Sequence, residues 1–184
     1  MNMEREELRK VIEGLIFVSD EPVNEKTFQK VFGDSIDLST IRGILEELKL
    51  EYSSPLHGFE LVEVAGGYQF RTKKELGEWI RKLEKFQPQR FSRSAMEVLS
   101  IIAYKQPVTR AEIEAMRGGI DSSGALKTLL LKKLIKISGR KHDAPGRPFT
   151  YSTTRKFLEV FGLKDLSDLP PIEEFMKREE GKEG

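Results

Sequence analysis

The pattern of apolar and turn residues in this chain occurs twice, at an offset of 85 residues. Pro22-Val23 corresponds to Pro107-Val108, and Gly33 corresponds to Gly118. Six pairs of apolar residues share this offset: Ile16 with Ile101, Phe17 with Ile102, Phe28 with Ile113, Ile41 with Leu126, Ile44 with Leu129 and Leu45 with Leu130. Such a repeat indicates one structural plan built twice, so we expect two small domains within the 184 residues.

The first half predicts three helices at short spacing. A stripe with the i, i+3, i+4, i+7 spacing of an amphipathic helix consists of Leu8, Val11, Ile12 and Leu15. Pro22 ends that helix, because proline lacks the N–H that a helix needs. Asn24 is placed to cap a second helix that runs to about Val31. Apolar residues at helical spacing mark a third helix, namely Ile41, Ile44, Leu45 and Leu48.

A hairpin and a fourth helix are predicted to complete the first half. Strand-like runs at 59–64 and 68–71 flank Gly66 and Gly67, and paired glycines supply the positive φ of a tight turn. Thr72 and Glu75 have the spacing of a capping box. The helix expected after them has one apolar face, made of Leu76, Trp79, Ile80 and Leu83.

The second half predicts the same order of elements. Capping boxes at Ser94 with Glu97 and at Thr109 with Glu112 open two helices, which are separated by the break at Gln106-Pro107. A third helix is expected over Asp121 to Leu134, with lysines on its solvent side. The remaining predicted elements are strands at 135–138 and 149–153, a long loop at 139–148 and a short helix around 157–161.

Three helices followed by a hairpin with a projecting turn make the winged-helix plan. The predicted fold class is therefore mostly α with small β-hairpins (α+β), arranged as tandem winged-helix domains. The N-terminal domain is expected over residues 1–86 and the C-terminal domain over 92–166, because residues 87–89 interrupt the helical pattern. Residues 167–184 are expected to form a partly disordered tail, since their end is charged and aperiodic.

The residue types present argue against an enzyme. The chain has no cysteine, and its two histidines, His57 and His142, have no metal-ligand spacing. The glycine at 124 lacks the spacing of a phosphate-binding loop. We therefore predict no catalytic residue, no metal and no cofactor. No run approaches the roughly 18 apolar residues of a membrane span, and no signal peptide is evident, so a cytoplasmic location is expected.

Specific motifs narrow the prediction further. They are the run 101–110 (IIAYKQPVTR), Arg117-Gly118, the run 146–154 (GRPFTYSTT) and Phe161-Gly162-Leu163. Together they closely resemble the segregation and condensation protein B family, ScpB, and the match extends over nearly the whole chain. Lys105, where an arginine is expected, and one extra residue at Gly119-Ile120 depart from the family pattern. The second departure puts in doubt the geometry of the turn before the third helix.

The resemblance implies a non-enzymatic subunit of the bacterial-type condensin. Such a subunit forms a homodimer and binds the kleisin ScpA, which bridges a pair of SMC ATPase heads, so its link to SMC is indirect. The candidate partner-binding residues are Tyr104, Arg147, Phe149 and Tyr151, which are large residue types common at interfaces. A core role for Phe149 and Tyr151 stays open. The candidate dimerisation residues are Leu8, Val11, Ile12 and Leu15.

A winged-helix transcription regulator that binds DNA is the alternative function. Residues 88–156 carry 14 basic and 5 acidic side chains, and a basic third helix and wing can contact DNA. The candidate phosphate contacts are Lys127, Lys132, Lys133, Arg140 and Lys141. Leu131 interrupts the basic helix face, however, and the whole chain carries a net charge of only +1. We therefore expect DNA contact that is weak and non-specific at most.

Overall fold

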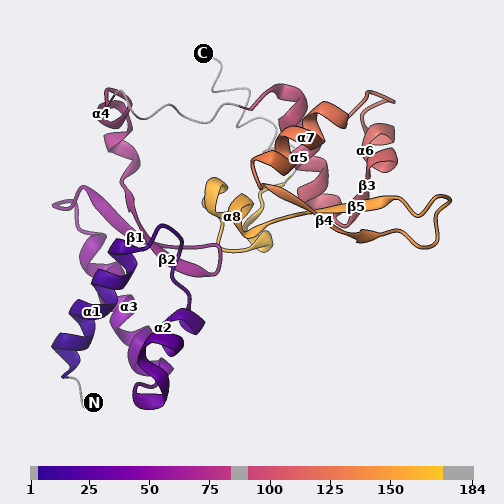
Figure 1. The fold of residues 1–184 in the computed structure, drawn as a ribbon. Helices are drawn as coiled ribbons and strands as arrows, with labels where there is room; N and C mark the ends of the chain where they lie inside the picture. The colour runs from indigo at the N-terminus through magenta and orange to yellow at the C-terminus, as the bar shows by residue number, and fades with distance from the viewer. Residues whose placement is uncertain (1–3, 84–90, 172–184) are drawn as a thin grey trace. The chain divides into compact units, whose positions relative to one another are not determined.

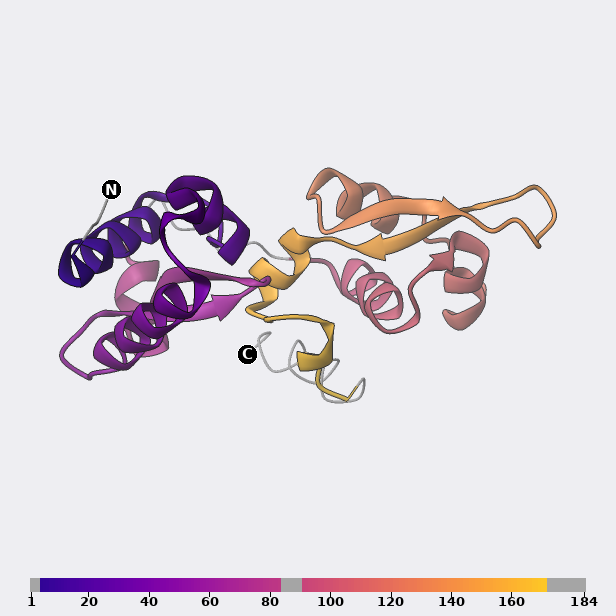
Figure 2. The same cartoon turned by 90° about the horizontal axis from the view of Figure 1, so that it is seen from below.

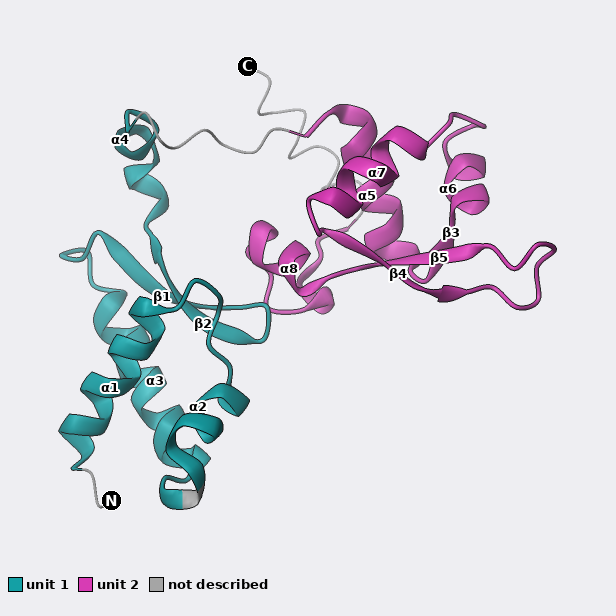
Figure 3. Ribbon diagram, in the orientation of Figure 1, with its two compact units in different colours: residues 1–88 teal, residues 89–184 magenta. Residues whose placement is uncertain are grey.

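A computed structural model describes residues 4–83 and 91–171, and the chain divides into two compact units (Figure 3). Unit 1 comprises residues 1–88 and unit 2 comprises residues 89–184. Each unit has a hydrophobic core of its own. The predicted boundary at 87–89 and the C-terminal end from residue 172 lie outside the described residues.

Unit 1 begins with the three predicted helices: α1 (Arg5–Val18), α2 (Glu25–Phe32) and α3 (Leu38–Tyr52) (Figure 1). The predicted cap is present, because the Asn24 side chain accepts the backbone N–H of Thr27 at 2.9 Å. Asp37 caps α3 in the same way, through the N–H of Thr40. A short 3-10 turn, η1 (Gly33–Ser35), lies between α2 and α3. The three helices bury their apolar stripes against one another, and the core includes Ile12, Phe28 and Ile44.

An antiparallel hairpin follows, made of β1 (Phe59–Val64) and β2 (Gly67–Thr72). Val23, which precedes α2, pairs with Tyr68 of β2 through backbone hydrogen bonds of 2.8 and 2.9 Å. Gly67 lies directly against this pair, because a Cβ at position 67 would be 2.9 Å from the carbonyl carbon and oxygen of Val23. Glycine is therefore required there by close backbone approach.

The predicted capping box at Thr72 and Glu75 is wrong. The chain instead enters a 3-10 turn, η2 (Lys74–Leu76), and then the short helix α4 (Gly77–Arg81), neither of which has a side-chain cap. The physical reason lies in Lys73, which is buried and whose ammonium donates to the carbonyl oxygens of Ser53 and Ser54 at the end of α3. That contact fixes the chain at Lys73, one residue beyond the predicted cap.

Unit 2 contains four helices and three strands between residues 91 and 171. They are α5 (Arg93–Lys105), β3 (Val108–Thr109), α6 (Arg110–Met116), α7 (Ser123–Leu131), β4 (Ile135–Arg140), β5 (Phe149–Thr153) and α8 (Arg155–Phe161). The strand order is β3-β5-β4, and the β4–β5 hairpin projects past the helices of the unit in two views (Figures 1 and 2). The predicted fold class, α+β with tandem winged helices, is confirmed.

Two of the helix starts in unit 2 differ in how well they were predicted. The capping box at Thr109 and Glu112 is confirmed, with both reciprocal bonds present. The box at Ser94 and Glu97 is wrong, because Ser92 caps α5 by accepting the N–H of Ala95. Ser94 and Glu97 instead accept hydrogen bonds from the side chain of Arg117, the residue after α6, as described below.

Helix α7 is shorter than the predicted 121–134. It ends at Leu131, and Lys133 has φ of 57°, a left-handed backbone that a helix cannot contain. Lys132 and Lys133 therefore lie in the turn after the helix, and the next residue, Leu134, is buried in the core.

The repeat found in the sequence is also present in the backbone. Val108 of β3 pairs with Tyr151 of β5, just as Val23 pairs with Tyr68 in unit 1. In both units the Pro-Val step after the first helix thus adds a third segment beside the second strand of the hairpin.

The first residues of the predicted tail are packed against unit 2. After the short turn η3 (Leu166–Asp168), Leu169 contacts the core, and the Tyr104 hydroxyl donates to the carbonyl oxygen of Pro170. The described part of the predicted tail, 167–171, therefore lies against the domain that precedes it.

Candidate partner-binding surface

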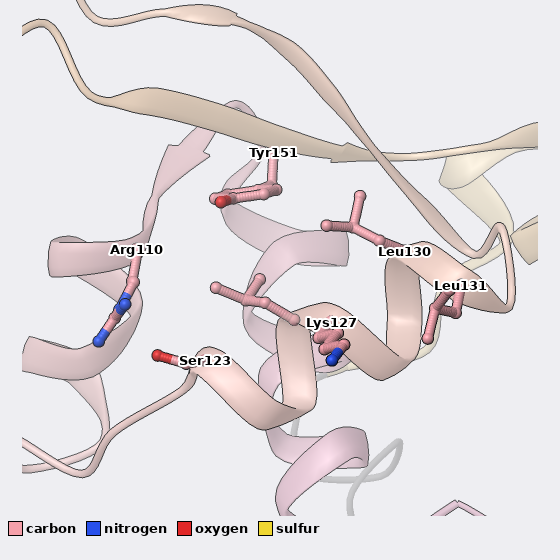
Figure 4. Close-up of a pocket in the computed structure, with 7 residues that line it drawn as sticks. Arg110, Ser123, Lys127, Leu130, Leu131 and Tyr151 are labelled. Carbon is pink, nitrogen blue, oxygen red and sulfur yellow. The ribbon is translucent and has the colours of Figure 1, made fainter.

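A groove in unit 2 lies between α7, the start of α6 and strand β5 (Figure 4). Its volume is about 430 Å³, and it opens to solvent. It is lined by Arg110, Ser123, Leu126, Lys127, Leu130, Leu131 and Tyr151. In a DNA-binding winged helix, the helix at the position of α7 is the one that enters the major groove. The groove therefore lies on the surface that such a protein would turn toward DNA.

The walls of this groove are largely apolar. Leu131 is 74% exposed at the end of α7. Beside the groove lining, Ile137 of β4 is 48% exposed and pairs with Tyr151 in the strand register. Leu126 is buried beneath them, while Leu130 and Tyr151 are partly buried. Exposed leucine side chains form no hydrogen bonds with phosphates, so the groove suits apolar side chains of a partner better than a nucleic-acid backbone.

Two cations, Arg110 and Lys127, line the groove, and they differ in whether they have ion-pair partners. Arg110 donates to Glu114 at 2.6 Å and to Asp121 at 2.7 Å. The backbone N–H of Ser122 and then Arg110 lower the pKa of Glu114, which keeps this carboxylate ionised beside the guanidinium. The Lys127 ammonium has no ion pair or hydrogen bond with any residue in the two ranges that the structure describes.

The Arg117 side chain links the start of α7 to helix α5. Its side chain is only 5% exposed and pairs with Glu97 of α5, with Nη2 3.1 Å from Oε2. It also donates to the Ser94 hydroxyl at 2.9 Å, the Ser122 hydroxyl at 3.0 Å and the Asp121 carbonyl oxygen at 3.2 Å. One guanidinium thereby joins α5 to the turn before α7. The turn itself contains Gly118 and Gly119, both at positive φ, a backbone conformation that favours glycine.

The hairpin next to the groove is held by its own cations. Lys141 donates to Glu112 at 2.6 Å, and this ammonium together with the N–H and hydroxyl of Thr109 lowers the pKa of Glu112 to about 2. The Arg140 guanidinium lies 4.1 Å from the centre of the Phe149 ring and donates to the carbonyl oxygen of Arg147 at 3.1 Å. Arg140 therefore stabilises the hairpin itself, whereas Lys141 joins the hairpin to α6.

The structure separates the four predicted partner-binding residues. Tyr151 lines the groove, and Phe149 lies two residues along the same face of β5, 43% exposed under Arg140. Arg147 is in the exposed loop of the hairpin with φ of 44°. Tyr104 packs on the core and bonds to Pro170, so it lines no part of the groove.

The predicted dimerisation stripe is divided between the core and the surface of unit 1. Leu8 and Ile12 are buried in the core of the unit. Val11 and Leu15 are partly buried and keep some accessible surface. Two further apolar residues at the end of α1, Phe17 and Val18, are 76% and 75% exposed.

Of the five candidate phosphate contacts, only Lys127 lies on α7. Lys132 is placed over the Phe91 ring, 5.4 Å from its centre, and Lys133 is in the turn after the helix. Arg140 and Lys141 make the hairpin contacts described above. The five cations therefore do not form one continuous basic face on the recognition helix.

Sequence reasoning missed most of the groove, namely Arg110, Ser123, Leu126 and Leu130. The available signal was Leu131, an apolar residue that interrupts the helix face predicted to carry lysines. The described residues contain no cluster of His, Cys, Asp or Glu able to hold a metal ion. Nor does any helix within 4–83 and 91–171 combine the length and apolar character needed to cross a membrane.

Known proteins match this chain over almost its full length. The family model described as segregation and condensation complex subunit ScpB matches residues 10–172. Segregation and condensation protein B of Syntrophotalea carbinolica is 49% identical over 94% of this chain and 86% of its own length. The protein of the same name from Myxococcus xanthus is 44% identical over 91% of this chain, which spans 50% of that longer protein.

A solved structure shows a further similarity. The crystal structure of ScpB from Mycobacterium tuberculosis is 28% identical, with a TM-score of 0.42, covering 89% of this chain and 99% of that chain. The family match and the identity to the curated relatives together identify this chain as a member of the ScpB family of segregation and condensation complex subunits.

Proposed function

We propose that this chain is a non-enzymatic subunit that forms a homodimer, binds an extended segment of the kleisin ScpA and, through the kleisin, regulates SMC at the nucleoid in the cytoplasm. The observation that carries the proposal is the groove beside α7, which is apolar on the surface where a DNA-binding winged helix would be basic. The β4–β5 hairpin adds a strand edge next to it, since β4 is the last strand of its sheet in the described residues. Apolar grooves and free strand edges are two common ways to hold a flexible chain.

Dimerisation is assigned to unit 1. The supporting observation is the exposed apolar surface on and beyond the predicted stripe of α1, with Val11 and Leu15 partly accessible and Phe17 and Val18 open to solvent. A small domain gains buried apolar area by pairing, and the usual arrangement is a twofold contact of one patch with itself.

The absence of turnover is part of the proposal. The ScpB family is a structural, non-enzymatic one, and the described residues offer neither a metal cluster nor a cysteine nucleophile. ATP hydrolysis by the purified chain, abolished by a substitution in the chain itself, would contradict the assignment.

Co-expression with the kleisin of the same genome followed by affinity purification tests the function directly. We expect the full chain to retain the kleisin, with or without SMC heads. Tyr151→Ala and Arg147→Ala should weaken retention, because losing a buried interface anchor typically costs about 2 kcal/mol, roughly thirtyfold in affinity. Circular dichroism must first show that each variant is folded. Failure of the intact chain to retain the kleisin in any arrangement refutes the proposed function.

A further inference from the structure

We infer that the groove beside α7 selects a kleisin segment in which an apolar side chain stands next to a carboxylate, and that Lys127 determines this specificity by pairing with the carboxylate. The inference rests on the proposed function, because it names the chemistry of the partner segment at the same site. It concerns one position that family membership alone does not assign.

The apolar part of the inference follows from the groove walls. Leu130 and Leu131 of α7 and Tyr151 of β5 line an opening of about 430 Å³. Ile137 of β4 is the strand partner of Tyr151 and extends this apolar surface along the hairpin. Leu131 and Ile137 are 74% and 48% exposed, so part of the apolar surface stays in contact with water when the groove is empty. Covering that surface with an apolar partner side chain is favourable.

The carboxylate part follows from the charges that remain unpaired. Lys127 lies three and four residues before Leu130 and Leu131, which places all three on one side of α7. The other polar groups of the rim are occupied, because Arg110 is held by Glu114 and Asp121 and the Ser123 hydroxyl donates to Asp121 at 2.8 Å. Within the described residues, Lys127 is therefore the one cation of the groove lining without an internal partner.

A nucleic-acid ligand fits these observations less well. Phosphate binding needs several cations along one surface, whereas α7 offers one. Arg140 is engaged within the hairpin, and Lys141 is paired with Glu112 of α6. A single lysine beside the exposed Leu131 matches one carboxylate beside an apolar side chain.

Charge reversal with a matched control tests the role of Lys127. Lys127→Glu should weaken kleisin binding about tenfold at low salt, since it replaces an attraction by a repulsion of similar size. The difference from wild type should shrink as salt is raised. Lys136→Glu is the control, because Lys136 is exposed on the opposite face of β4 from Ile137 and should change affinity less than twofold. Equal affinities of wild type and Lys127→Glu, with kleisin still retained, overturn the inference and leave the proposed function intact.

Photo-crosslinking identifies what occupies the groove. A benzophenone amino acid replacing Leu131 in the full chain, co-expressed with the kleisin, should yield a crosslinked kleisin peptide with Asp or Glu within a few residues of the crosslinked apolar side chain. Mass spectrometry reads that peptide directly. Crosslinks to a second copy of this chain, to duplex DNA supplied as competitor, or to a kleisin peptide without a carboxylate would each refute the inference.

Discussion

Replacing Arg117 by lysine should destabilise unit 2 far more than its conservative nature suggests. The guanidinium donates five hydrogen bonds to four residues on α5 and on the turn before α7, at 2.9–3.3 Å. A lysine ammonium has one nitrogen, so it can stay with Glu97 but cannot also reach the partners on the other side. Losing about three of these bonds at about 1 kcal/mol each gives an expected cost of about 2–3 kcal/mol.

Urea unfolding of the full chain, followed by circular dichroism, measures that cost. Hydrogen exchange with mass spectrometry locates it, because amides of α5–α7 should lose protection while those of α1–α3 should not. Arg110→Lys is the matched control: its side chain is 50% exposed, and such ion pairs contribute less than about 1 kcal/mol. A change below about 0.5 kcal/mol for Arg117→Lys, or an equal loss of protection in both units, would refute the reasoning.

Three further predictions follow from particular contacts. Gly67→Ala should destabilise unit 1 by about 1–3 kcal/mol, because the added Cβ meets the Val23 carbonyl at 2.9 Å. Gly14→Ala, in open space on α1, should instead stabilise the unit by about 0.5–1 kcal/mol. Thermal unfolding of the two variants measures both changes. The Lys141 ammonium is the main cause that lowers the pKa of Glu112 in the folded state to about 2. The contribution of the ionised Glu112 to the free energy of unfolding is therefore complete above pH 4.5 and is lost as pH falls toward 2. Urea midpoints of wild type and Glu112→Gln should therefore converge near pH 2, and midpoints that stay apart would contradict this. Light scattering should give a dimer mass for the wild type. Phe17→Asp should shift that mass toward the monomer, because a charge replaces an exposed apolar side chain at the proposed interface. A monomeric wild type at micromolar concentration would refute dimerisation.

The sequence was sufficient where structure depends on neighbouring residues. Helical spacing placed α1 to α3 and α8, and Asn24 and Thr109 were found as caps. Gly66 was found in the turn of the first hairpin, but the second residue at positive φ is Ala65, and Gly67 is the first residue of β2. Each of these features is decided within a few residues of chain.

The predictions failed where a distant residue decides the outcome. Ser94 and Glu97 have the spacing of a cap, but Arg117, some twenty residues later, takes both side chains. Thr72 lost its predicted role because Lys73 is bound to the end of α3. The groove could not be predicted for the same reason, since it exists only when α7, the start of α6 and β5 are brought together.

The valine–tyrosine strand pair present in both units has a consequence for how this chain has diverged. The same backbone pair is present in the two copies of one fold, as Val23 with Tyr68 and as Val108 with Tyr151. The surface has changed instead: residues 1–87 hold 13 basic and 17 acidic side chains, whereas residues 88–184 hold 18 and 13. The chain thus presents one scaffold twice with opposite net charges, so the two units offer different surfaces to their surroundings.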